Sequence, residues 1–111
     1  MDINKEVLKG YIDTILLSLL EDKPLYGYEI AKSVREKCHG QFELKEGTMY
    51  LALKRLEQNS LVECFWGEEA SEGGRRKYYR LLPAGRERLK QKKEEWDFLK
   101  RVMDVFLKVS L

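Results

Sequence analysis

A single predicted β-hairpin, set between helical segments, is the sequence feature that most restricts the fold. Residues 61–66 and 76–82 are rich in aromatic and aliphatic side chains, and the polar segment 67–74 separates them. Two such runs joined by a polar segment that contains glycine are typical of a hairpin with an extended tip. The tip is acidic at Glu68 and becomes basic at Arg75, so we expect its charge to change along its length.

Apolar residues at three- and four-residue spacing predict four helices around this hairpin. They cover residues 5–21, 27–38, 46–59 and 83–109. Pro24 ends the first helix, Gly40 suits a left-handed cap after the second, and Pro83 suits the first turn of the last. Three short helices followed by a hairpin is the element order of a winged helix-turn-helix. We expect a mainly α (α+β) fold, with residues 1–82 as the winged helix and residues 83–111 as an added C-terminal dimerisation helix of the same structural unit.

Length and composition indicate one globular domain. The chain has 111 residues, of which 43 % are hydrophobic, too large a share for a disordered chain. No apolar run approaches the ~20 residues needed to span a membrane. Residues 1–6 lack the basic start and apolar run of a signal peptide. We therefore expect a cytoplasmic protein with no membrane partner, in which Cys38 and Cys64 are reduced and packed rather than bridged.

The nearly neutral net charge of +2 hides a strong asymmetry along the chain. Residues 1–74 carry 9 basic and 14 acidic side chains, whereas residues 75–101 carry 11 basic and 4 acidic ones. A polyanion would be drawn to the later segment. A solvated helix face rich in Lys and Glu explains the same composition, so charge alone leaves both interpretations open.

The third predicted helix combines an apolar stripe with an outer face that carries an aromatic ring and a cation. Met49, Ala52, Leu53 and Leu56 repeat at helical spacing and are expected to face inward. In a winged helix the third helix enters the DNA major groove, and the hairpin tip follows the backbone or the minor groove. Hydrogen-bonding side chains read base edges, and cations bind phosphates. The residues expected to contact DNA are Tyr26, Lys45, Thr48, Tyr50, Lys54, Arg75, Arg76 and Lys77.

Several of these candidates also have a purely structural interpretation. Tyr50 could cover the edge of the core, and Tyr26 could pack at the start of the second helix. The cations of residues 75–77 could be ordinary solvated side chains, although their clustering favours phosphate contact. The alternative function is a protein–protein adaptor that docks through a winged helix without binding DNA. Lys54 and the basic tip favour the DNA-binding interpretation over the adaptor.

The first and last predicted helices each carry two apolar stripes, one more than a single core can use. A monomer of this size cannot easily bury both, so we expect a homodimer built from these two helices. Two-fold symmetry would present two recognition helices to a palindromic operator on double-stranded DNA. The residues expected in the dimer interface are Leu8, Tyr11, Phe98, Val102, Met103, Val105 and Phe106.

Three segments carry a family resemblance, and they read LYGYEIAKSV, EGTMYLALKRLEQNSLV and GGRRKYYRLLPAGRERL. Together and in this order they resemble the PadR family of transcriptional regulators over nearly the whole chain. The single short C-terminal helix resembles the smaller PadR subfamily. The resemblance implies a homodimer with interlocked terminal helices that represses adjacent genes, often those of transporters or detoxification proteins.

The motifs KRLE, WG and GGRRKYYRL, together with Trp96, resemble a multidrug-binding regulator of this family. That resemblance implies a pore at the dimer centre, where a planar aromatic ligand stacks between paired Trp96 side chains. Lys100 stands where that regulator has an acidic residue and would repel cationic drugs, whereas Asp13 replaces a neutral residue and would partly restore the preference for them. Without the resemblance, Trp96 on an apolar stripe indicates interface packing. The ligand-binding residues implied are Val7, Gly10, Asp13, Thr14, Leu17, Trp96, Leu99 and Lys100.

No sequence motif indicates an enzyme. The chain has one histidine and neither a nucleophile-elbow nor a phosphate-loop motif, so no catalytic residue is assigned. Cys38, His39 and Cys64 lack the paired-cysteine spacing of a structural zinc site, and we expect no metal and no cofactor. A metal sensor is a third interpretation, which stoichiometric metal in the purified protein would reveal.

Overall fold

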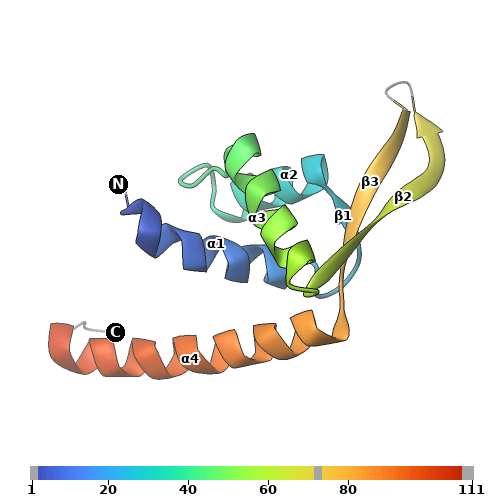
Figure 1. The fold of residues 1–111 in the computed structure, drawn as a ribbon. Helices are drawn as coiled ribbons and strands as arrows, with labels where there is room; N and C mark the ends of the chain where they lie inside the picture. Colours follow the sequence, from blue (N-terminus) through green and yellow to red (C-terminus); the bar gives the residue numbers. More distant parts are fainter. Residues whose placement is uncertain (1–2, 72–73, 109–111) are drawn as a thin grey trace.

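The computed structural model describes residues 3–71 and 74–108, which form four helices and a small antiparallel sheet (Figure 1). The sheet has three strands in the order β1-β3-β2. This architecture confirms the expected mainly α winged helix-turn-helix with a long C-terminal helix. In chain order the elements are α1 (Lys5–Leu19), β1 (Leu25–Tyr26), α2 (Gly27–Lys37), α3 (Glu46–Gln58), β2 (Val62–Ser71), β3 (Gly74–Leu81) and α4 (Pro83–Leu107).

The helix ends follow the local capping chemistry of the sequence. The Asn4 side chain accepts a hydrogen bond from the Glu6 N–H at the start of α1, and α1 ends at Leu19, two residues before the predicted end. Gly40 has a φ of 74° beyond the end of α2, as expected for a left-handed cap. No side chain caps the start of α4, where Pro83 is the first helical residue. Residue 109, in the predicted last turn, lies outside the described residues.

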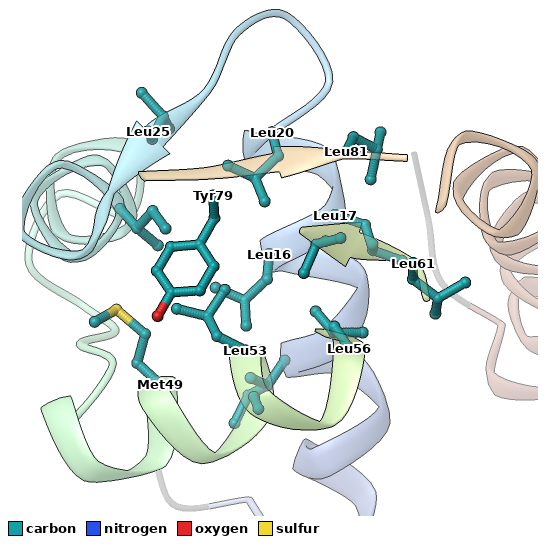
Figure 2. Close-up of a cluster of buried hydrophobic side chains, with 14 of the residues drawn as sticks. Leu16, Leu17, Leu20, Leu25, Met49, Leu53, Leu56, Leu61, Tyr79 and Leu81 are labelled. Atoms are coloured by element: carbon teal, nitrogen blue, oxygen red, sulfur yellow. The ribbon is translucent and has the colours of Figure 1, made fainter. Parts of the chain in front are cut away.

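The core lies between α1, α2, α3 and the sheet, and Leu44 and Leu89 also belong to it. The predicted inner stripe of α3 is confirmed, because Met49, Ala52, Leu53 and Leu56 are all buried. Tyr79 reaches from β3 into the same core, beside Met49 and Leu53 (Figure 2). Burying this many aliphatic side chains supplies the main driving force for folding.

The sheet is larger than the sequence analysis predicts. β1 was not expected, and it pairs with β3 at Leu25↔Tyr79 and Tyr26↔Tyr78. β2 and β3 extend into the segment 67–74 predicted as a loop, where their pairing resumes at Ala70↔Arg75 and ends at Ser71↔Gly74. The register is irregular between Trp66 and Ala70. The hairpin formed by β2 and β3, called the wing below, therefore extends well beyond the core (Figure 1).

The first turns of α4, called its base below, are packed against the rest of the chain, and the remainder of the helix extends beyond these contacts. Leu89 is buried, and Gly85 packs directly on the Leu61 backbone. The Arg86 guanidinium donates to the Glu21 carbonyl at 3.0 Å, and the Lys93 ammonium donates to the Glu21 carboxylate at 3.1 Å. α4 then runs below α1 toward the N-terminal end of that helix (Figure 1). Within residues 3–71 and 74–108, no helix is long and apolar enough to cross a bilayer.

Candidate nucleic-acid interface

Three elements expected to meet DNA extend toward the same side of the molecule. The start of α3, the start of α2 and the far end of the wing all point away from α4, which lies on the opposite side (Figure 1). This is the relation between recognition helix and wing that a winged helix needs to contact one face of a duplex. The fold therefore separates the expected DNA surface from the helix expected to form a dimer.

The outward face of α3 carries the predicted contact residues. Thr48, Tyr50 and Lys54 are exposed, and Lys45 is exposed at the helix N-cap. Leu51 is 69 % exposed on the same helix, although the sequence analysis did not select it. The exposure of Leu51 is predictable from the sequence, because Leu51 lies outside the buried stripe of α3 described above. An apolar side chain there is suited to contact a thymine methyl group in the major groove.

The three cations of residues 75–77 do not form one cluster, contrary to the sequence interpretation. Successive side chains of a strand point to opposite faces of the sheet, and Tyr79 on β3 faces the core. Lys77 shares that face, with its ammonium 5.8 Å from the Tyr79 ring centroid. Arg76 lies on the other face, with its guanidinium carbon 4.6 Å from the centroid of the Tyr26 ring. The wing therefore presents cations on both faces, and a cation–π contact holds Arg76 against Tyr26 of β1, the residue that precedes α2.

Four aromatic rings connect the wing to the start of α2, and we call them the outer-face stack. Tyr28 stacks on Tyr26 at 6.3 Å between ring centroids, and Tyr26 meets the edge of Tyr78 at 5.4 Å. Phe65 on β2 stacks on Tyr78 at 5.6 Å. Each such pair contributes about 0.5–1.5 kcal/mol of stabilisation beyond that from burying the two rings. The sequence does not predict this stack, which gives Tyr26 a packing role and a half-buried position beside Arg76.

The opposite face of the wing holds two groups whose pKa values are raised. The pKa of the Cys64 thiol rises because of its hydrogen bond with Glu57, its partial burial and the Glu57 charge, while Lys77 acts in the other direction. Burial raises the pKa of Tyr79 to about 12. Both groups are therefore protonated near neutral pH, and Cys64 lacks the thiolate character of a nucleophile. Cys38 and Cys64 are free, as expected. In the described part of the chain, no three His, Cys, Asp or Glu side chains gather to hold a metal ion.

A groove of ≈ 560 Å³ is lined by residues of α1 and α4. It brings together five of the eight predicted ligand-binding residues, which are Val7, Gly10, Thr14, Trp96 and Leu99. The Tyr11 ring meets the Trp96 ring edge-on, with 6.0 Å between centroids. Tyr11, Ile15, Lys92 and Glu95 complete the lining. The groove is open along one side and mainly apolar.

Three predicted ligand-binding residues do not line this groove. Leu17 is only 1 % exposed and packs in the core, because the C-terminal half of α1 is covered on both sides. The Asp13 carboxylate accepts hydrogen bonds from the Arg55 guanidinium of α3, which holds it away from the groove. Lys100 is exposed and lies beyond the lining residues.

The predicted dimer residues are mostly exposed on the single chain. Phe98, Val105 and Phe106 are 63 %, 72 % and 76 % exposed, and Tyr11 and Met103 are each 41 % exposed. Val102 is half-buried, and Leu8 packs partly against the core of its own chain. The apolar end of α4 is thus a contiguous surface with little cover from the rest of the chain.

The fold, the outward face of α3 and the cationic wing define a winged helix-turn-helix DNA-binding protein. The model of the transcriptional regulator PadR-like family matches residues 16–91. The chain is similar to a PadR family transcription regulator from hypervirulent Clostridium difficile, with 56 % identity and a TM-score of 0.80 over 88 % of this chain and 99 % of that one. It is also similar to a transcriptional regulator from Clostridium thermocellum, with 45 % identity and a TM-score of 0.83 over 95 % and 98 % of the two chains. An uncharacterized protein from Lysinibacillus sphaericus is 34 % identical over 105 residues, 95 % of each chain.

The chain belongs to the PadR-like family of transcriptional regulators. It is a DNA-binding regulator and not an enzyme. Membership of this family selects DNA binding over the adaptor function that the sequence left open.

Proposed function

We propose that the protein is a homodimeric repressor that binds a palindromic operator and is released from it by a planar aromatic ligand. The observation that carries the dimer is the apolar surface of α4, where Phe98, Val105 and Phe106 are each between 63 % and 76 % exposed. Monomeric proteins rarely expose contiguous apolar surface of this kind, and two α4 helices packed together would bury it. A regulator of this type acts where the DNA is, which supports the cytoplasmic location expected from the sequence.

In the proposed complex, α3 enters the major groove. Thr48, Tyr50 and Lys54 would meet base edges there, and Lys45 would lie near the flanking phosphates. The wing would lie along the adjacent backbone, with Arg75 and Lys77 contacting phosphates from one face and Arg76 from the other. Tyr26 would add a hydroxyl next to Arg76, because the two side chains are already in contact.

The α1–α4 groove is the proposed ligand site. Two-fold symmetry would bring two such grooves together, so that a flat ring system could stack between two Trp96 side chains. Ligand binding at this seam would change the angle between the two winged helices and move the recognition helices off their ~34 Å spacing. The ligand releases the dimer from DNA only if it binds the arrangement that cannot engage the operator more tightly than the arrangement that can. A transporter or detoxification gene next to the coding sequence would support this sensing role.

The repressor proposal is tested on DNA from upstream of the protein's own gene. We expect a sequence-specific gel shift at low salt that weakens steeply as salt is added, because Lys and Arg displace counterions from phosphates. No specific shift at low salt would contradict the proposed operator binding.

Substituting the wing cations is expected to lower the salt dependence of DNA binding. Each phosphate contact contributes about 0.9 to the slope of log K against log salt concentration, so Arg75→Ala with Lys77→Ala should reduce the slope by about 3–4 in a dimer. Arg76→Ala should weaken binding to all sequences and also loosen the outer-face stack. Arg88→Ala, an exposed cation on α4, is the matched control and should leave the slope unchanged. An unchanged slope in the double variant would remove the wing from the interface.

Tryptophan fluorescence is expected to report ligand binding. In a Trp66→Phe background, planar aromatic compounds should quench the remaining Trp96 emission in a saturable way, at one ligand per dimer. Neutral and cationic compounds of similar shape would show which charge the site accepts. Quenching that rises linearly without saturation would contradict a stacking site at Trp96, while leaving DNA binding in place.

A further inference from the structure

We infer that Gly27 is a positioning residue for DNA recognition, because its missing side chain provides the space in which the Tyr50 ring rests. The inference builds on the DNA contact proposed for Tyr50. It adds that the start of α2 sets the orientation of that side chain before DNA arrives.

The two residues belong to different helices and touch directly. Gly27 is the first residue of α2 and is buried, and Tyr50 lies in the second turn of α3. A Cβ on Gly27 would lie 2.8 Å from Cζ of Tyr50 and 3.3 Å from its Cε1, and closer still to the hydroxyl oxygen. Gly27 is helical and has no positive φ, so its need for glycine is one of space and not of backbone conformation.

The backbone of Gly27 is fixed more firmly than the Tyr50 side chain. Tyr26, the preceding residue, pairs with Tyr78 of β3, and its N–H donates to the Glu29 carboxylate at 3.2 Å. Tyr50 is 41 % exposed, so its ring can move toward solvent. An added methyl group at position 27 would therefore displace the ring rather than the helix.

Holding the ring against α2 has a direct consequence for recognition. A side chain already ordered in the free protein loses less conformational entropy when it contacts a base. Leu44, Glu46 and Met49 line a hollow beside the ring with Gly27 and Tyr50, so the ring has a defined seat between α2 and α3. Gly27→Ala would free the ring without altering any atom proposed to contact DNA.

The test is a double-substitution cycle on the dimeric protein. Binding is measured by fluorescence anisotropy to a duplex that the wild type selects from a random pool, and to a scrambled duplex of equal length. Gly27→Ala should weaken binding to the selected duplex by about fivefold to tenfold, with binding to the scrambled duplex unchanged. The effect should be smaller in a Tyr50→Phe background, which removes the hydroxyl, and absent in a Tyr50→Ala background.

The outcomes separate this inference from the DNA-binding proposal. Failure of the wild type to select any duplex would overturn DNA binding itself. If the wild type binds, two results would show that Gly27 does not act through Tyr50. One is that Gly27→Ala binds the selected duplex as tightly as the wild type does. The other is that Gly27→Ala causes the same loss of affinity in the Tyr50→Ala background. If Gly27→Ala alone is unstable, the double variant decides. A double variant that folds and binds as tightly as Tyr50→Ala supports the inference. A double variant that binds more weakly than Tyr50→Ala, or that does not fold, contradicts it.

Discussion

Phe98→Glu combined with Val105→Glu is expected to convert the protein into a monomer and to weaken operator binding by about 100-fold or more. Both side chains are largely exposed on one stripe of α4 and contribute little to the core of their own chain. In a dimer they would be buried, and the new carboxylates would repel each other across the two-fold axis. A monomer engages one half-site and loses the gain that comes from linking two recognition helices.

Sedimentation equilibrium measures the first part of this expectation, and anisotropy on a palindromic duplex measures the second. The wild type should have twice the 13.2 kDa mass of the chain, and the double variant should have the mass of one chain. Lys90→Glu changes the net charge by the same amount on an exposed, polar part of α4, so it is the matched control and should remain dimeric. A monomeric wild type, or a double variant that remains dimeric, would contradict the role assigned to α4.

Gly85→Ala is expected to lower the free energy of unfolding by about 2 kcal/mol, which corresponds to a fall in Tm of about 10 °C. A Cβ on Gly85 would lie 2.6 Å from Cδ1 of Leu81, and closer still to the carbonyl oxygen of Leu61. That carbonyl already accepts a hydrogen bond from the Leu82 N–H at 3.0 Å, so the backbone cannot easily move away. The substitution would separate the base of α4 from the end of α3 and from the wing.

Gly47→Ala is the matched control for this prediction, because Gly47 also lies in the first turn of a helix. No atom lies within 4 Å of a Cβ on Gly47, so the substitution should stabilise the protein by about 0.5 kcal/mol through a lower chain entropy of the unfolded state. Thermal unfolding at one fixed protein concentration compares the two variants, since dimerisation makes Tm depend on concentration. Equal Tm values for Gly85→Ala and the wild type would mean that the base of α4 packs less tightly than described.

The helices of the DNA-binding part could be predicted closely from the sequence. α2 and α3 each end one residue before the predicted end, because apolar spacing marks both ends locally and the left-handed Gly40 also marks that of α2. The strands were harder to predict. β1 has two residues, too few for any periodicity, and it forms only because β3 offers a free edge. β2 is longer than its apolar run, since the pairing with β3 resumes at Ala70↔Arg75 after an irregularity that follows Trp66.

The side-chain environments that depend on distant residues could not be predicted. Asp13 was assigned to the ligand site by resemblance, but its partner Arg55 is 42 residues away and leaves no local trace in the sequence. Leu17 follows Leu16 on α1, and helical spacing alone placed the two on different stripes. The core covers both of them, so the second stripe of α1 is shorter than predicted. The placement of Arg76 and Lys77 on opposite faces of the wing was predictable from the sequence, because successive residues of a strand alternate between the two faces.

Selection of duplexes from a random pool, followed by sequencing and footprinting at low salt, tests the central claim most directly. We expect a palindrome whose two half-sites have centres about 10 base pairs apart, or a multiple of that distance, with protection of the major groove in each half-site. Tyr50→Ala should change the bases preferred within the half-site. No enriched sequence, or an enriched site without two-fold symmetry, would contradict a dimeric regulator that reads DNA through α3.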